Sequence, residues 1–347
     1  MSDVVVQWND LQEFTSTVFA HAGMSEDDAA LEAEVLVWAN LRGIDSHGVL
    51  RVDNYLDKVD TGSYKVRPEI RVLKETPATL LIECDQCFGP IATTMAMEKA
   101  IDKARTVGIG WASLRNHGHQ GAMAYYTHMA TAKGMAGMTV CTNPPNMVPP
   151  GARTAATHNS PLSIAVPANR HPPISLDMAT SIVAGGKLEY ARDQRMELPD
   201  DWAFDESGEP TTDPFKATFL RPAGGYKGYG MALLFECLTG VLVGNPILVP
   251  WIRELQPKPL QGVQNSFVCA IDVDTFTDQD DYRQHIDDLI DTMHATPVQE
   301  GSDPIQVPGE RENAVCEQRT RDGIPLPEGT VNKLIVAADR FGIELPW

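Results

Sequence analysis

Three side chains with different polar chemistry recur at intervals of four residues in SHGVLRVDNYLDKV, the segment of residues 46–59. If this segment is a helix, His47, Arg51 and Tyr55 share one side of it, next to a side of apolar residues. A histidine exchanges a proton near neutral pH, an arginine fork matches a carboxylate, and a tyrosine adds a hydrogen bond. Together they suit an anionic substrate that gains or loses a proton. The alternative interpretation is an ordinary solvated helix face.

A pair of histidines in RNHGHQGAMAYY forms a second candidate. His117 and His119 are predicted to lie in a loop between a strand and a helix, where reactive groups often occur. The H-x-H spacing can bind a metal ion, but no nearby carboxylate or cysteine completes a ligand set, so we expect no metal. A general acid–base or substrate-orienting role is the favoured interpretation, and an ordinary loop histidine is the alternative.

A glycine-rich segment, AGGYKGYG, surrounds Lys227 and precedes a long apolar stretch. Backbone N–H groups at a helix start favour an anion, and the lysine adds positive charge. The segment is neither a Walker loop, G-x-x-x-x-G-K-[ST], nor a Rossmann fingerprint, which reads G-x-G-x-x-G after a strand. If the protein binds a nucleotide, it therefore uses another framework. Glycines that permit close helix packing are the alternative interpretation.

The composition limits the partners and the compartment. With 28 basic and 47 acidic residues among 347, the net charge of −19 argues against nucleic acid and anionic membranes as partners. We expect no signal peptide, and the longest apolar run, from Met231, is too short for a membrane span and carries Glu236. Six scattered cysteines, including the lone C-x-x-C of Cys84 and Cys87, favour a reducing compartment, so we expect a cytoplasmic protein.

The hydrophobic periodicity predicts an α/β fold. Ser25 and Asp28 predict the start of a helix that stops at Gly43, and two strands are expected around a turn at Pro77. After that turn the expected elements are a helix over 91–108, a strand over 109–116, a helix over 120–134 and a strand over 135–143. This strand–helix–strand alternation is typical of an α/β core.

The second half of the chain continues this pattern after a proline-rich loop over 143–161. Short strands are expected at LSIAVP and PISLDMAT, followed by a helix from about residue 181. The almost entirely apolar stretch 227–244 predicts a helix that is buried on most sides. A strand is expected over 265–272, and the last sixty residues are predicted to be mostly helical.

Six motifs occur in an order that resembles a known enzyme family. They are RGIDSHGVLR, GHQGAMAYY, LDMATSIVAGGK, PTTDP, GGYKGYGMALLFECLTGVLVG and VPGERE. They resemble the type 2 malate/L-lactate dehydrogenase family, which includes ureidoglycolate, sulfolactate and 2,3-diketogulonate oxidoreductases and a cyclic-imine reductase. The resemblance covers nearly the whole chain. It implies a non-Rossmann nicotinamide-binding α/β fold of the L-sulfolactate dehydrogenase type, and a homodimer with the active site near the subunit boundary.

The resemblance also implies roles for individual residues. His47 would be the proton donor, with Ser46 beside it. Arg51 would hold the substrate carboxylate and Tyr55 would line the pocket, while His119 matches a second catalytic histidine. The residues implied in cofactor binding are Asn143, Ser175, Leu176, Asp177, Met178, Ala179, Thr180, Lys227, Gly309, Glu310 and Arg311.

We therefore expect an oxidoreductase that transfers a hydride between NAD or NADP and a small 2-hydroxy acid or its 2-oxo partner. The cofactor stays open between the two because Gly185 stands where the family has an arginine before Lys187. A metal-dependent hydrolase that uses His117 and His119, or a non-catalytic metabolite-binding protein, are the alternative functions. Residues 1–75 with 305–347 are expected to form a helical outer domain that carries the His/Arg stripe, and residues 76–304 the α/β cofactor-binding region.

Overall fold

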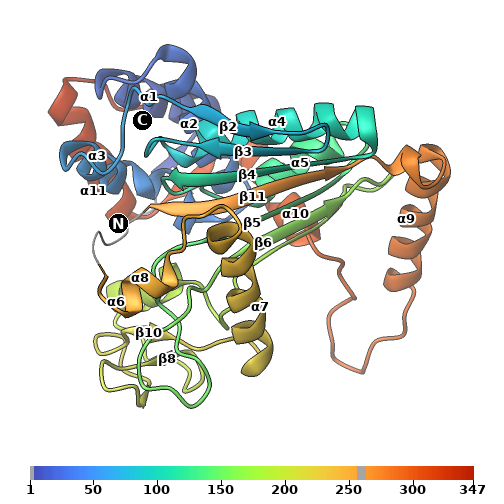
Figure 1. Cartoon of the computed structure of the whole chain (residues 1–347). Coiled ribbons are helices and arrows are strands. Elements are labelled where there is room, and N and C mark those ends of the chain that lie inside the picture. The colour runs from blue at the N-terminus through green and yellow to red at the C-terminus, as the bar shows by residue number, and fades with distance from the viewer. Residues whose placement is uncertain (1–3, 256–262) are drawn as a thin grey trace.

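A seven-stranded mixed sheet runs through the computed structural model, which describes residues 4–255 and 263–347 (Figure 1). The neighbouring strands β3 and β4 run parallel, and every other neighbouring pair of this sheet is antiparallel. In spatial order the strands are β2 (Arg71–Glu75), β3 (Thr79–Glu83), β4 (Ile109–His117), β11 (Gln264–Ile271), β5 (Ala136–Thr142), β6 (Leu162–Val166) and β7 (Ile174–Met178). The predicted α/β class is confirmed. The antiparallel pairing also explains the missing Rossmann fingerprint, which belongs to parallel βαβ units.

Helices cover both faces of this sheet (Figure 1). On one face lie α4 (Gly89–Val107) and α5 (Ala124–Thr131), and on the other lie α7 (Tyr226–Glu236) and the π-helical turn η3 (Cys237–Val241) that continues it. α4 approaches β4 so closely that a Cβ at Gly110 would overlap the backbone of Ala100. The helix ends where it was predicted to end, because Gly108 adopts the left-handed conformation with φ of 87°.

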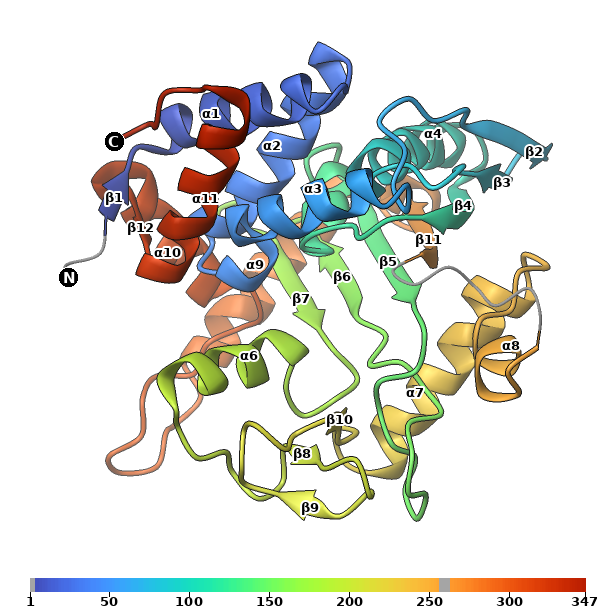
Figure 2. The same ribbon diagram turned by 90° about the vertical axis from the view of Figure 1, so that its left-hand side faces the viewer.

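A helical layer packs against one end of the sheet and joins the two ends of the chain (Figure 2). Strand β1 (Val4–Val6) pairs with β12 (Ile324–Leu326), and one apolar cluster includes residues from both termini, such as Leu11 and Leu334. The helices of this layer are α1 (Trp8–His21), α2 (Glu26–Leu41), α3 (Val52–Asp60), α10 (Glu310–Asp322) and α11 (Glu328–Phe341).

As predicted, Ser25 caps α2: the Asp28 N–H donates to the Ser25 hydroxyl at 3.1 Å. Because β2 belongs to the large sheet, we propose that the helical part ends before Arg71, and not after residue 75.

A smaller lobe lies below the sheet (Figure 2). It packs around its own apolar cluster, which includes Met147 and Leu188. Its elements are α6 (Gly185–Gln194), β8 (Ala203–Phe204), β9 (Pro210–Thr211) and β10 (Phe219–Leu220). The remaining described helices are α8 (Leu248–Ile252), the 3-10 turn η4 (Val273–Thr275) and α9 (Gln279–His294).

The segment 46–59 is not the continuous helix that its spacing predicts. Two 3-10 turns, η1 (Asp45–His47) and η2 (Val49–Arg51), precede α3. Gly48 between them is extended, with φ of −94° and ψ of −154°, and a Cβ there would lie 2.1 Å from the Asn40 side chain. Asn40 Oδ1 accepts the Val49 N–H at 2.8 Å, so a side chain takes the place of a helical carbonyl. The predicted helices at 120 and 181 also begin later, at Ala124 and Gly185.

The prediction of an apolar helix buried on most sides is wrong for the single chain. Several aliphatic side chains of α7, η3 and α8 are exposed, with Leu234 62% and Leu242 63% exposed. The helix covers the sheet with its other side, where Ala232 and Thr239 are buried. Within the described residues, no helix is both long and apolar enough to cross a membrane.

Candidate active site

A cavity of about 690 Å³ opens where the helical layer meets the sheet. Its wall comes from the end of α2 and the turns after it, the loop between β4 and α5, strand β7, and the first turns of α6 and α10. Segments that are far apart in the sequence therefore share one space. Its volume is typical of a site for a small molecule or a cofactor.

The cavity brings together most of the residues that the sequence predicted. Those that line it are Ser46, His47, Arg51, His119, Asn143, Ser175, Leu176, Asp177, Met178, Ala179, Gly309 and Arg311. Four predicted residues do not line it: Tyr55, Thr180, Lys227 and Glu310.

The two 3-10 turns present His47 and Arg51 to the cavity. His47 Nδ1 lies 2.9 Å from the Ser46 hydroxyl, and the Arg51 Nε–H donates to the Ser46 carbonyl at 2.6 Å. That bond fixes the guanidinium plane of Arg51. The two terminal nitrogens of the guanidinium have no hydrogen-bond partner in the described parts of the chain. They can therefore receive a carboxylate through two parallel hydrogen bonds.

His119 lies against His47. Their ring centroids are 5.3 Å apart and the rings are nearly parallel, at 29°. Burial, and then the charge of Arg51, lowers the pKa of His47 to about 4. Burial, followed by the charges of His47 and Arg51, lowers the pKa of His119 well below its usual value. Both rings are therefore neutral at neutral pH, and an anion bound at Arg51 would favour their protonation.

Tyr55 lies behind His119, in the apolar core of the helical layer. It is 1% exposed, and its hydroxyl oxygen lies 2.6 Å from His119 Nδ1. The expectation that Tyr55 lines the pocket is wrong because α3 starts only at Val52, which gives Tyr55 a different direction from His47. Tyr55 can reach a substrate only through His119.

His117 has no access to the cavity, although it is two residues from His119. It ends β4 and is fully buried, with Nδ1 at 2.7 Å from the Gly118 carbonyl and Nε2 at 2.8 Å from the Ser266 hydroxyl. It therefore has a structural role. The pair on which the hydrolase alternative depended is separated, and the described residues contain no group of three metal-binding side chains in reach of one ion.

The cavity wall contains polar atoms that fit a nicotinamide cofactor. Asn143 Oδ1, Gln120 Oε1 and Gln264 Oε1 are buried and have no hydrogen-bond partner among the described residues, and their side chains line the cavity. Buried acceptors of this kind need a donor, and a carboxamide N–H₂ group supplies two. His158 Nδ1 is also buried without a partner among the described residues, and it can donate or accept according to the tautomer of the ring. Sequence reasoning missed Gln120, His158 and Gln264; only Gln120, inside the GHQGA motif, gave a signal.

Asp177 on β7 combines two contacts in this wall. Its Oδ2 accepts the Ala124 N–H at 2.7 Å at the start of α5, and its side chain reaches the cavity. The surrounding protein raises the pKa of Asp177 to about 6, although the hydrogen bond from Ala124 opposes that shift. The shift makes this carboxyl easier to protonate than an ordinary aspartate.

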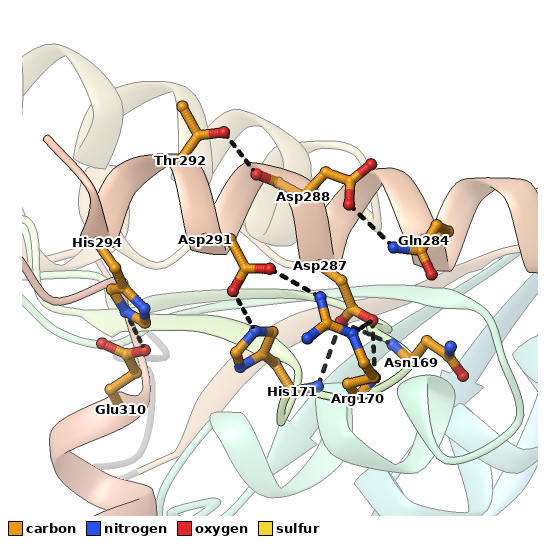
Figure 3. A network of polar contacts seen from close by, with 10 residues as sticks. All are labelled: Asn169, Arg170, His171, Gln284, Asp287, Asp288, Asp291, Thr292, His294 and Glu310. Atoms are coloured by element: carbon orange, nitrogen blue, oxygen red, sulfur yellow. Dashed lines mark hydrogen bonds and ion pairs between the residues drawn. The ribbon is translucent and has the colours of Figure 1, made fainter.

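The other predicted cofactor residues lie elsewhere. The Glu310 carboxylate binds His294 Nε2 at 2.6 Å and accepts the Val307 N–H at 2.9 Å, so it holds the turn before α10 against α9 (Figure 3). Thr180 is buried next to the cavity wall. Lys227 is exposed at the start of α7. Contacts of these three residues with a cofactor remain predictions.

Comparisons with known proteins agree with this geometry. A family model described as malate/L-lactate dehydrogenase matches residues 6–335. The chain belongs to this family. Among its relatives, a ureidoglycolate dehydrogenase (NAD(+)) from Escherichia coli is 32% identical over 94% of this chain and 93% of that protein. An L-sulfolactate dehydrogenase from Methanocaldococcus jannaschii is 32% identical over 93% of each chain.

The fold of this malate/L-lactate dehydrogenase family member is shared with solved structures. A malate dehydrogenase from Entamoeba histolytica superposes with a TM-score of 0.94 at 26% identity, over 99% of this chain and 100% of that one. The sulfolactate dehydrogenase from Methanocaldococcus jannaschii gives 0.86 at 30% identity, over 98% of each chain. The predicted fold type and the predicted 2-hydroxy acid dehydrogenase function are confirmed, and the hydrolase and the non-catalytic binding protein are not favoured.

Proposed function

We propose that this enzyme interconverts a small 2-oxo acid and its 2-hydroxy acid with NAD as its cofactor. The observation that carries the proposal is the convergence of Arg51, His47 and His119 on one cavity wall. An anion anchor next to two neutral imidazoles suits a carboxylate whose neighbouring carbon changes between carbonyl and alcohol.

Each residue of the site has a separate role in the proposed reaction. Arg51 binds the carboxylate with its two free nitrogens, which fixes the distance and direction of C2. When bound, the dihydronicotinamide supplies the hydride that reduces C2. His47 delivers a proton to the C2 oxygen, a contribution worth roughly 10²–10⁴-fold for a well-placed histidine. Two of the three unpaired amide oxygens of Asn143, Gln120 and Gln264 would accept the two N–H groups of the cofactor's carboxamide.

The preference for NAD rests on two supports. The printed name of the Escherichia coli relative specifies NAD(+). Gly185 lines the cavity where the family pattern has an arginine, so a cation that could hold the extra phosphate of NADP is missing at this position. We therefore expect a lower KM for NADH than for NADPH.

We also propose a homodimer. A set of exposed aliphatic side chains on α7, η3 and α8, which we call the α7 face, consists of Leu234, Leu238, Val241, Leu242, Val249 and Ile252. Glu236, the charged residue between positions 231 and 252, points inward and is 4% exposed. A large uncharged aliphatic surface is typical of a protein–protein interface.

All six cysteines are free, which supports a reducing, cytoplasmic location.

A substrate panel tests the proposed function. Purified full-length protein would be mixed with NADH or NADPH and with oxaloacetate, pyruvate, 3-sulfopyruvate, oxalurate or cyclic imino acids, and dihydronicotinamide absorbance would be followed. The expected result is turnover of at least one 2-oxo acid, faster with NADH, and a loss of roughly 10²-fold or more in kcat for His47→Ala. Turnover unaffected by His47→Ala would contradict the role of His47, and no turnover with any acid would contradict the proposal.

A further inference from the structure

Two hydrogen-bond donors converge on one ring nitrogen of His119. The Tyr55 hydroxyl lies 2.6 Å from His119 Nδ1, and the Gly121 backbone N–H donates to the same nitrogen at 3.2 Å. A backbone N–H can only donate, so Nδ1 has to accept and holds no proton. A neutral imidazole in this position therefore carries its proton on Nε2, and this nitrogen has no partner among the residues that the structure describes.

We infer that Tyr55 is a positioning residue that holds His119 as the Nε2–H tautomer, so that His119 donates a hydrogen bond to the C2 oxygen of the substrate. The identity of the substrate rests on the proposed function, whereas the tautomer does not. The inference divides the work of the two stacked histidines. His119 binds and polarises the oxygen, and His47, whose Nδ1 meets a hydroxyl that can donate or accept, is free to carry the proton.

The surroundings of Tyr55 keep its hydroxyl in this role. Its ring packs against Phe19 and Phe88, with centroids at 6.4 Å and 5.9 Å, so the side chain cannot turn away. Burial, with a smaller contribution from the nearby Glu32 carboxyl, raises the pKa of Tyr55 well above its usual value. The phenol therefore stays protonated and can donate a hydrogen bond to His119 Nδ1.

The backbone of His119 is held separately from its ring. The Tyr64 hydroxyl accepts the His119 N–H at 2.8 Å and does not touch the imidazole nitrogens. Tyr55 and Tyr64 are neighbours, with ring centroids 5.9 Å apart, and both are buried. The chain therefore offers a matched control: two phenols in one cluster, of which one contacts the ring and the other contacts the backbone.

Nitrogen-15 NMR of histidine-labelled full-length protein tests the inference, because protonated and unprotonated ring nitrogens give well-separated signals. His119 would be assigned from the signals that disappear in His119→Gln. The wild type should show an unprotonated Nδ1 and a protonated Nε2. Tyr55→Phe keeps the packed ring but removes the shorter of the two hydrogen bonds to Nδ1 and leaves only the 3.2 Å bond from the Gly121 N–H, so the second tautomer should become detectably populated, whereas Tyr64→Phe should retain the wild-type ring signals.

A kinetic readout accompanies the NMR measurement. Tyr55→Phe should lower kcat/KM for the 2-oxo acid about tenfold, the scale of one lost hydrogen bond, and leave the Kd of the cofactor unchanged. A proton on Nδ1 in the wild type, or wild-type ring signals in Tyr55→Phe, would overturn the inference. Because the NMR experiment needs no turnover, an inactive wild type would refute the proposed function alone and leave the tautomer assignment standing.

Discussion

Arg51 performs two tasks with one side chain. Its Nε–H donates to the Ser46 carbonyl at 2.6 Å, which leaves the terminal nitrogens as a fixed fork toward the cavity. Because that bond joins Arg51 to the residue before His47, the anion anchor and the proton carrier keep a constant separation. A lysine would retain the charge but could not make both sets of contacts.

We predict that Arg51→Lys lowers kcat/KM for the 2-oxo acid by about 10–100-fold, or roughly 1.4–2.7 kcal/mol of transition-state binding. The measurement is steady-state kinetics with the best substrate and with its amide analogue. The amide should be poor for the wild type and lose little more with the variant, while cofactor affinity stays nearly unchanged. Equal losses for acid and amide would show that Arg51 does not bind the carboxylate.

Because His47 is neutral in the free protein, we predict that binding of a 2-oxo acid is accompanied by uptake of a proton at His47. Without an anion at Arg51, burial and the Arg51 charge keep the pKa of His47 at about 4, so the ring is uncharged at pH 7. A bound carboxylate offsets that charge and raises the pKa, so the complex prefers the protonated ring. Substrate binding should therefore weaken by up to about tenfold per pH unit as pH rises from 5 toward the pKa of the complex.

Calorimetry with cofactor present, in two buffers of different ionisation heat, measures this uptake directly. The expected result is a net uptake of at most one proton per 2-oxo acid, larger at pH 5 than at pH 8. The 2-hydroxy acid, which brings its own proton, should take up less, and His47→Gln should abolish the uptake. Uptake that persists in His47→Gln would assign the proton to another group.

At the scale of elements, the turns that carry His47 and Arg51 are held from two sides. The Asn40 amide donates to Asp45 at 2.6 Å, and Arg319 of α10 binds both Asp45 carboxylate oxygens, at 2.7 Å and 3.0 Å. Because Gly309, directly before α10, and Arg311 in its first turn line the cavity, the same helix forms part of the predicted cofactor site and holds the catalytic turn.

A larger residue at Gly48 would disturb this arrangement of the turns. A Cβ at Gly48 would meet the Asn40 side chain at 2.1–2.6 Å and displace it from Val49 and Asp45. We predict that Gly48→Ala lowers the free energy of unfolding by roughly 1–3 kcal/mol and kcat by about tenfold or more. Urea unfolding and steady-state kinetics would measure both effects.

The matched control is Gly329→Ala in the first turn of α11, where an added Cβ meets nothing within 4 Å. Its stability should stay within about 1 kcal/mol of the wild type, on the stabilising side, and its kcat should not change. If Gly48→Ala behaves like this control, the contact between Gly48 and Asn40 does not fix the catalytic turn.

At the scale of the whole molecule, the α7 face predicts an interface between two copies of the chain. We predict that a Leu234→Lys, Leu242→Lys double variant shifts the protein from dimer to monomer in analytical ultracentrifugation at micromolar concentration. Two charges buried in an apolar interface cost several kcal/mol without partners. Phe276→Lys is the control. Phe276 directly follows η4, is 77% exposed and lies outside the α7 face. A monomeric wild type would contradict the proposed homodimer.

The sequence predicted the fold class and most element boundaries, because periodicity reports local structure well, and most of the site residues that its resemblance to the family implied do line the cavity. It placed Tyr55 wrongly because helical spacing holds only while the helix continues, and Asn40 and Gly48 interrupt it. It overestimated the burial of α7, since an apolar residue in the sequence does not tell whether its own chain buries it, or whether it would be covered only in the proposed dimer. Buried amides such as Gln264 carry no local pattern, and only the assembled cavity shows them.

Deuterium labelling can follow the hydride from the cofactor to C2 of the substrate. The protein would be incubated with NADH that carries deuterium at the transferable C4 position and with the best 2-oxo acid of the panel, and the product would be examined by NMR. We expect a single 2-hydroxy acid enantiomer with deuterium at C2, and at least a tenfold lower rate for Arg51→Lys at subsaturating acid. A product without deuterium at C2, or deuterium transfer at an unchanged rate in Arg51→Lys, would contradict the proposed reaction.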